Sequence, residues 1–221
     1  AMLDGCALLD LDLEFIRSGQ AHGLCSAVVT AQEVEKSLKA CGKLPAAVYL
    51  TSPDYLGVQS DIAAIAEVCH KYGTLLAVDN AHGAYLAFLE ASKHPIHLGA
   101  DLCCDSAHKT LPVLTGGAYL HLHENIVSEI LDSARKGLTM FGSTSPSYLI
   151  LQSLDLCNEY LEREFRRELA ECVKKIRQFK KAAGDRGLHI MEGEPLKIVI
   201  DTGASGYDGE EIAGELREFV Y

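Results

Sequence analysis

The sequence lacks any apolar run approaching the roughly 20 residues that a membrane-spanning helix needs. It also lacks a basic segment followed by an apolar stretch at its start, so no secretion signal is visible. Positive charge is scarce, because 20 Lys and Arg stand against 31 Asp and Glu, a net charge of −11. This balance argues against nucleic acid or an anionic membrane surface as the main partner. We therefore expect a cytoplasmic protein with neither a nucleic-acid nor a membrane partner.

Cysteines with C-x-x-C spacing are also absent, so a zinc site has little support. The eight cysteines are scattered through apolar and helical patterns, which indicates buried free thiols in a reducing compartment. Cys103 and Cys104 are neighbours in a predicted strand, where adjacent side chains point to opposite faces. His121 and His123 alternate on another predicted strand, but no third ligand lies at a sensible spacing. We interpret both histidines as structural and predict no metal site.

A chain of 221 residues can build one good core and a second small lobe. Its 48% hydrophobic and 23% charged residues are ordinary for a globular protein. The segment Gly184–Gly187, with a glycine at each end, marks a domain boundary. We therefore predict a large domain over residues 1–184 and the start of a small C-terminal lobe over residues 185–221.

Two short apolar runs, Leu75–Val78 and Ala100–Cys104, each precede an acidic residue, Asp79 and Asp105. Runs of this length bounded by polar residues are typical of strands buried on both faces of a parallel sheet. Ala46–Leu50 has the same character, and helical patterns separate the runs. Strands alternating with helices predict an α/β fold, a mostly parallel sheet with helices on both faces.

Local signals define the other predicted elements. Thr30 with Glu33 three residues later forms a capping box for a helix that runs to about Cys41. Further helices are predicted over Met2–Leu9, Ser60–Tyr72, Gly83–Leu89, Glu124–Ala134 and Gly209–Val220, with one long helix or a kinked pair over Ser147–Ala183. Further strands are predicted over Leu11–Ile16, Gly117–His121 and Leu196–Asp201, with a connection over Arg17–Ser26 and a loop over Gly137–Pro146.

Chemically active side chains follow two of the predicted strands. Asp79 and His82 come after one strand, and Ser106, His108 and Lys109 come after the next. In open α/β sheets, ligands bind beyond the carboxyl ends of the strands. An acid, two imidazoles and a lysine that meet there form the pattern of a lysine Schiff-base site with an acidic partner for a pyridinium nitrogen.

The same residues carry a family resemblance. The segments DNAHGAYL (79–86), DSAHKTLPVLTGG (105–117), TSPDYLGVQSDI (51–62) and GSTSPSYLILQSLD (142–155) resemble the Orn/Lys/Arg decarboxylase family, and the resemblance runs from about Met2 to Asp155. Cysteine desulfurases also place a histidine before their Schiff-base lysine, but four motifs in the right order favour the decarboxylases. The resemblance implies pyridoxal 5'-phosphate as cofactor and the large domain of the aspartate-aminotransferase fold.

The resemblance implies roles for four residues around the cofactor ring. Lys109 would form the Schiff base, although a loop lysine can also be an ordinary surface residue. Asp79 would pair with the pyridine nitrogen, with a turn-forming aspartate as the alternative. Ala81 would lie against the ring face. His82 would reach the phenolic oxygen or the substrate carboxylate, or would be a satisfied polar histidine.

It also implies contacts to the phosphate. Ser106 and His108 would donate to the phosphate, or would only cap the following turn. Thr51 is a weaker candidate for contact with the ring. Ser143 and Thr144 resemble a loop that reaches the phosphate of a neighbouring subunit, which implies a homodimer with shared active sites. An N-cap at Ser145 or Ser147 is the structural alternative for that loop.

The implied activity is decarboxylation of a basic amino acid, which is lysine, ornithine or arginine. The matched stretch opens near Met2, after Ala1 as a tag remnant, whereas in the family an upstream segment supplies the glycine-rich phosphate loop. We therefore expect a member truncated at both ends. Two alternatives stay open: another reaction on the same scaffold, such as transamination or a lyase reaction, and a fragment that folds and dimerises without turnover.

Overall fold

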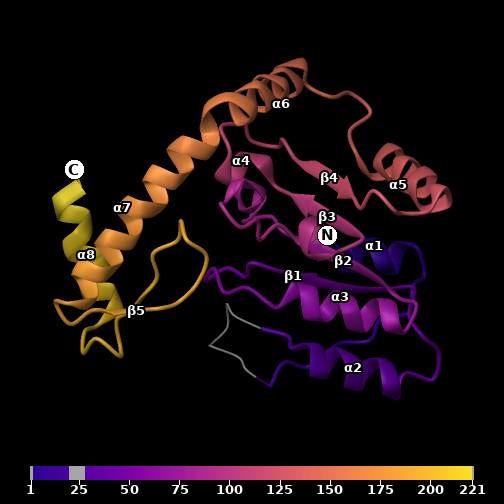
Figure 1. Ribbon diagram of the computed structural model, residues 1–221, viewed down its shortest axis with the longest axis horizontal. Helices are drawn as coiled ribbons and strands as arrows, with labels where there is room; N and C mark the ends of the chain where they lie inside the picture. The colour runs from indigo at the N-terminus through magenta and orange to yellow at the C-terminus, as the bar shows by residue number, and fades with distance from the viewer. Residues whose placement is uncertain (1, 20–27, 221) are drawn as a thin grey trace.

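The structure is a computed structural model that describes residues 2–19 and 28–220 (Figure 1). Most of the predicted connection Arg17–Ser26 therefore lies outside the described residues. The first element is helix α1, Met2–Leu8, close to the prediction.

A four-stranded sheet forms the centre of the fold. Its strands are β1 (Ala47–Thr51), β2 (Leu75–Asp79), β3 (Leu102–Asp105) and β4 (Tyr119–Leu122), in the order β1-β2-β3-β4. β1, β2 and β3 run parallel, and β4 pairs antiparallel with β3. The α/β class and the mostly parallel sheet are confirmed, and the carboxyl ends of three strands meet at one edge.

Helices α2 (Ala31–Ala40) and α3 (Ile62–Lys71) cover one face of this sheet (Figure 1). Their buried residues pack with those of the strands in one core, which includes Val34, Leu38, Val48, Ile65, Leu76 and Val78. The capping box is confirmed, because the Thr30 hydroxyl accepts a hydrogen bond from the Glu33 amide and the Glu33 carboxylate accepts one from the Thr30 amide. β1 alternates between exposed and buried residues, so Tyr49 on its other face stays 42% exposed.

A second core lies beyond the carboxyl edge of the sheet. It joins the 3₁₀ helix η1 (Ala84–Phe88) and the short helix α4 (Ala107–Thr110) to a long C-terminal helical stretch. That stretch consists of α6 (Tyr148–Tyr160), a π-helical turn (Leu161–Phe165) and α7 (Arg166–Gly184), which confirms the predicted long or kinked helix. Both loops that carry the predicted site residues are thereby packed against a helix.

The C-terminal residues add two short strands and a helix, β5 (His189–Ile190), β6 (Ile200–Asp201) and α8 (Gly209–Val220). β5 and β6 pair antiparallel, so the predicted strand Leu196–Asp201 is much shorter than expected. Its first residues instead reach back to the loop after β1, where the Lys197 ammonium donates to the Tyr55 carbonyl at 2.8 Å. The predicted division at residue 184 stays a prediction.

Two further predictions from local pattern are wrong. Leu11–Ile16 alternates like a strand, but no described strand pairs with it, and Leu11, Leu13 and Phe15 are exposed. Helix α5 occupies Ser128–Phe141, so it starts later and ends later than Glu124–Ala134 and takes up part of the predicted loop. Gly137 lies inside this helix. A glycine there destabilises the helix by about 1 kcal/mol relative to alanine, which is too little to end it.

The described cysteines are all free, but not all are buried. Cys69, Cys103 and Cys157 are buried as predicted, whereas Cys104 and Cys172 are exposed. Cys104 alternates with Cys103 on β3, and its side chain therefore faces the less covered side of the sheet. Within the described part of the chain, no helix is long and apolar enough to span a membrane.

Candidate functional site

The carboxyl ends of β1 and β2 bring Thr51 and Asp79 together. The two residues are direct partners in the parallel register. One carboxylate oxygen of Asp79 accepts from the Ala81 amide at 3.0 Å, and the other accepts from the Tyr49 hydroxyl at 3.1 Å. These bonds hold the Asp79 carboxylate in a defined orientation at the edge of the sheet.

Tyr49 was missed in the sequence, although it lies two residues before Thr51 and therefore on the same face of β1. Burial and the neighbouring Asp79 raise the pKa of Tyr49 above its ordinary value. The phenol is therefore neutral, and its hydroxyl donates a hydrogen bond to Asp79. This contact fixes the position of Asp79 Oδ2.

Lys109 and His82 approach each other across the two loops. The Lys109 Nζ atom lies 3.4 Å from His82 Nε2. Burial lowers the pKa of His82, and the positive charges of Lys109 and Lys197 lower it further. His82 is thus a neutral imidazole that accepts a hydrogen bond from the Lys109 ammonium. Lys109 itself lies in the short helix α4 and is exposed.

A cleft of about 640 Å³ opens beside these two side chains. This volume lies within the range of small-molecule sites. Its polar lining comes from the segments after β2 and β3 and from the C-terminal residues. It consists of His82, Lys109, Thr110, Glu194 and Lys197. The C-terminal residues 194–198 therefore form one wall, a contribution that no motif in the sequence indicated.

Glu194 fixes that wall. Its side chain is buried and accepts hydrogen bonds from the Tyr85 hydroxyl and, at 2.9 Å, from the Leu196 amide. Its own amide donates to the Gly57 carbonyl at 2.7 Å. Burial raises the pKa of Glu194. The cleft thus has a wall that is attached to η1 and to the loop after β1.

The predicted phosphate residues are partly in place. Ser106 occupies the N-cap position of α4, yet its hydroxyl makes no capping hydrogen bond, so the capping alternative is not what the structure shows. His108 Nδ1 lies 3.0 Å from the Gly117 carbonyl and donates to it, so its Nε2 is the nitrogen left for a ligand. A donor at Nε2 as well requires the imidazolium form.

Ser143 and Thr144 do not join this group. Both are exposed in the connection between α5 and α6, which Figure 1 places away from α4. The Ser143 hydroxyl accepts from the Ser145 amide at 3.1 Å, a local turn contact. Ser147 occupies the N-cap position of α6 but makes no side-chain capping bond. A role for Ser143 and Thr144 in a neighbouring subunit stays a prediction.

The donor set fits a phosphorylated pyridine aldehyde. The Thr110 hydroxyl oxygen, next to Lys109 in the lining, is buried and has no hydrogen-bond partner among the described residues. A buried hydroxyl without a partner is costly, so a polar ligand group in the cleft would satisfy it. The primary amine of Lys109 lines the same cleft, whereas the oriented Asp79 carboxylate and Ser106 lie at the ends of β2 and β3, outside its lining.

His94, Asp105 and His121 form a second polar group under the site. Their ligand-type atoms lie within 4.8 Å of one another, close enough to be considered as a metal centre. His121 thus has two further ligand-type side chains nearby, although its predicted companion His123 is not one of them. His94 was missed because it lies in the loop before the 3₁₀ helix η2 (Pro95–Leu98), far from His121 in the sequence.

Gly83 ends the loop that carries Asp79 and His82, and it leaves no room for a side chain. A Cβ atom there would lie 2.0 Å from Asn80 Oδ1 and 2.6 Å from Leu86 Cδ1. We expect Gly83→Ala to lower the free energy of unfolding by about 1–3 kcal/mol, as overpacking does. Gly137→Ala, with nothing within 4 Å, should be neutral or slightly stabilising in urea unfolding. Equal stabilities of the two variants would contradict this packing.

Comparison with known proteins identifies similar sequences and folds. A family model described as Orn/Lys/Arg decarboxylase, major domain, matches residues 16–203. An uncharacterized protein, YaaO, of Bacillus subtilis is 33% identical over 77% of this chain and 38% of its own length. An arginine decarboxylase of the same organism is 31% identical over 76% of this chain and 36% of its own length. The chain thus spans about two fifths of the length of these curated relatives.

Solved structures show the same fold at lower identity. An apo cysteine desulfurase from Thermococcus onnurineus superposes with a TM-score of 0.66, at 19% identity, over 99% of this chain and 56% of its own. The Oryza sativa TDC solved with PLP gives a TM-score of 0.67 at 16% identity, over 91% of this chain and 44% of its own. The fold is therefore the aspartate-aminotransferase-like fold of enzymes that use pyridoxal phosphate.

Proposed function

Because the chain belongs to the Orn/Lys/Arg decarboxylase family, we propose that its cleft holds pyridoxal 5'-phosphate on Lys109 and serves the decarboxylation of a basic amino acid. The observation that carries the proposal is the convergence of Lys109, His82 and the oriented Asp79 carboxylate at one edge of the sheet. Arginine decarboxylases among the relatives favour arginine as the substrate, with lysine and ornithine as the other candidates.

Bound pyridoxal phosphate would supply an electron sink for the electrons left on the α-carbon when CO₂ departs. The residues of this chain have separate tasks around it. Lys109 would hold the cofactor covalently, and Asp79 would keep a proton on the ring nitrogen. Ser106 and His108 would donate to the phosphate, and Ala81 would leave the ring face accessible. Thr51, beside Asp79 in the register, would contact the ring.

His82 is suited to orient Lys109. Its neutral Nε2 lies 3.4 Å from Lys109 Nζ and accepts a hydrogen bond from it. Because the pKa of His82 is lowered, this nitrogen is a weak base, and its task is to position the lysine rather than to take its proton. His82 would also be close enough to orient the substrate carboxylate.

The proposal includes a homodimer in which Ser143 and Thr144 reach the phosphate of the neighbouring subunit. Their exposure in this chain is compatible with such a contact. It also includes a cytoplasmic location, which is supported by the free state of the described cysteines.

A decarboxylation assay tests the proposed activity. The purified chain loaded with pyridoxal phosphate is given arginine, lysine or ornithine, and the released CO₂ and amine are measured. We expect turnover of one basic amino acid, with arginine preferred, and none with alanine or glutamate. Cofactor bound on Lys109 without CO₂ release from any basic amino acid would contradict the activity and favour the alternative of a non-catalytic fragment. Release of a keto acid in place of CO₂ would favour transamination.

A further inference from the structure

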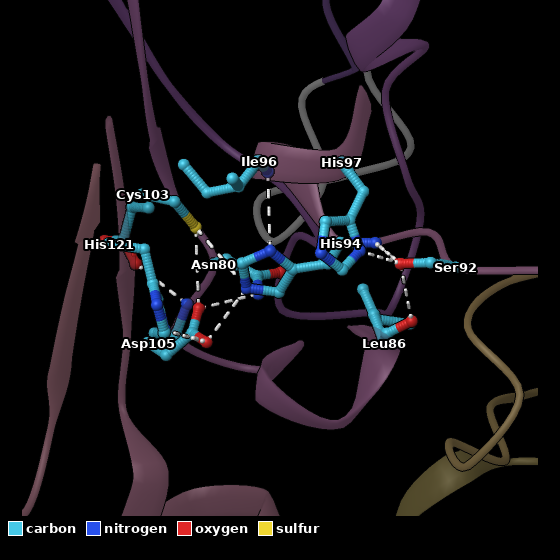
Figure 2. A network of polar contacts seen from close by, with 11 residues as sticks. Asn80, Leu86, Ser92, His94, Ile96, His97, Cys103, Asp105 and His121 are labelled. Carbon is cyan, nitrogen blue, oxygen red and sulfur yellow. Dashed lines mark hydrogen bonds and ion pairs between the residues drawn. The ribbon is translucent and has the colours of Figure 1, made fainter. Parts of the chain in front are cut away.

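Asp105 is a shared acceptor beneath the site (Figure 2). It is the last residue of β3, directly before Ser106 and four residues before Lys109, and it is 2% exposed. Its Oδ2 atom accepts from His94 Nε2 at 3.0 Å and from His121 Nε2 at 3.1 Å. These contacts come from the loop before η2 and from β4.

The other carboxylate oxygen connects Asp105 to the opposite loop of the site. The side chain of Asn80 donates through Nδ2 to Asp105 Oδ1 at 2.8 Å. The main-chain N–H of Asn80 donates to the Cys104 carbonyl at 2.9 Å. Asn80 is fully buried and stands between Asp79 and Ala81. One side chain and one main-chain bond therefore tie the end of β2 to the end of β3. We call Asn80, His94, Asp105 and His121 the Asp105 network.

Asp105 stays ionised in this network. Burial raises the pKa of its carboxyl, but hydrogen bonds from His121, His94 and Asn80 outweigh burial and hold the pKa well below its ordinary range. Burial and the charge of Asp105 raise the pKa of Cys103, whose thiol donates to Oδ1 at 3.5 Å. A buried carboxylate thus receives four donors and contributes a fixed charge to the base of the site.

The two histidines and the carboxylate would also suit a transition metal. The second contact of His94 argues against one. His94 Nδ1 accepts from the Ile96 amide at 3.4 Å, so the ring proton is on Nε2, where it is donated to Asp105. A metal on Nε2 would place that proton on Nδ1, facing the Ile96 N–H. The ring orientation therefore matches a network held by protons.

We propose that the Asp105 network is a positioning device that fixes the loop of Asp79 and His82 relative to the helix of Ser106 and Lys109. Its members act on the cofactor through Asp79 and Lys109 and need not touch it. The part that concerns the cofactor rests on the proposed function, whereas the tie between the two loops is a property of this chain alone.

The test compares Asp105→Asn with the matched control Asp101→Asn. Asp101 precedes β3 at its opposite end and also pairs with a histidine, because its Oδ2 accepts from His70 Nε2 at 3.0 Å and from the Leu76 amide at 2.7 Å. Both substitutions remove a charge from a His–Asp pair at one end of β3. One variant alters the site end of the strand and the other alters the far end.

The first readout needs no cofactor. Amide hydrogen exchange is followed at Gly83, whose N–H donates to the Asn80 carbonyl, and at Lys109, whose N–H donates to the Ser106 carbonyl. In Asp105→Asn we expect both amides to exchange about tenfold faster or more, since bonds to a charged acceptor are lost. In Asp101→Asn both should stay within about twofold of wild type. His121→Ala, which removes a half-exposed arm of the network, should show the same direction if Asp105→Asn does not fold.

The second readout is the bound cofactor. Asp105→Asn should raise the dissociation constant of pyridoxal phosphate about tenfold and lower the visible ellipticity per bound molecule, because the ring is less firmly oriented. Asp101→Asn should leave both unchanged. Unchanged exchange at Gly83 and Lys109 in Asp105→Asn and in His121→Ala would overturn the tie between the loops.

Two other outcomes are separable. Faster exchange with unchanged cofactor affinity and ellipticity would overturn the positioning role toward the cofactor. Uptake of one Zn²⁺ by the wild-type chain that is lost in His94→Ala would overturn the proton-held network. A wild-type chain that does not bind pyridoxal phosphate would refute the proposed function, while the exchange experiment would still decide the tie.

Discussion

Lys109→Ala is expected to abolish the visible absorbance that appears when pyridoxal phosphate is added to the wild-type chain, and with it all turnover. The covalent link requires a primary amine, and alanine has none. Lys109 Nζ is the amine that lies against a neutral acceptor, His82, in the cleft. The measurement is a spectrophotometric titration of both proteins at the same concentration.

Lys197→Ala is the matched control for this variant. Lys197 lines the same cleft, but its ammonium donates to the Tyr55 carbonyl at 2.8 Å and lies 5.6 Å from the centre of the Tyr55 ring. We expect this variant to keep the absorbance band, with at most a modest loss of affinity. A band of wild-type intensity in Lys109→Ala, or its loss in Lys197→Ala alone, would show that the lysine has been assigned wrongly.

The second large effect is expected from Asp79→Ala. Loss of a charge-assisted hydrogen bond to the ring nitrogen should raise the dissociation constant of pyridoxal phosphate roughly 10- to 100-fold, which corresponds to about 1.5–3 kcal/mol. Turnover should disappear, because without the carboxylate the ring nitrogen is not held protonated. Equilibrium titration and the decarboxylation assay measure these two losses separately.

Tyr49→Phe separates the charge of Asp79 from its orientation. It removes the hydroxyl 3.1 Å from Asp79 Oδ2 but leaves the carboxylate and its bond from the Ala81 amide. We expect less than a tenfold change in the dissociation constant, since Asp79 keeps its carboxylate and its bond from the Ala81 amide. If Asp79→Ala bound the cofactor as tightly as Tyr49→Phe does, Asp79 would not be the partner of the ring nitrogen.

The strands that carry the site could be predicted because their signals are local. Leu75–Asp79 is a short apolar run that ends in an acid, and the Thr30–Glu33 capping box fixes the start of a helix within four residues. The meeting of Asp79 and Thr51 then follows from parallel pairing, which places the carboxyl ends of β1 and β2 side by side.

The rest depends on contacts between distant residues. His94 and His121 meet at Asp105 because the loop before η2 folds under β3, and no periodicity in the sequence encodes that approach. Glu194 joins the site through Tyr85, which is more than a hundred residues away in the chain. Leu11–Ile16 shows the converse error, since an alternating pattern becomes a strand only where another strand is available to pair with it.

The most direct test of the account is borohydride reduction of the chain mixed with pyridoxal phosphate, followed by peptide mapping. Reduction converts the covalent link into a stable secondary amine and so marks the lysine that formed it. We predict one label per chain, on Lys109. Label spread over surface lysines such as Lys71 and Lys39, with none on Lys109, would contradict the claim that this edge of the sheet is a pyridoxal-phosphate site.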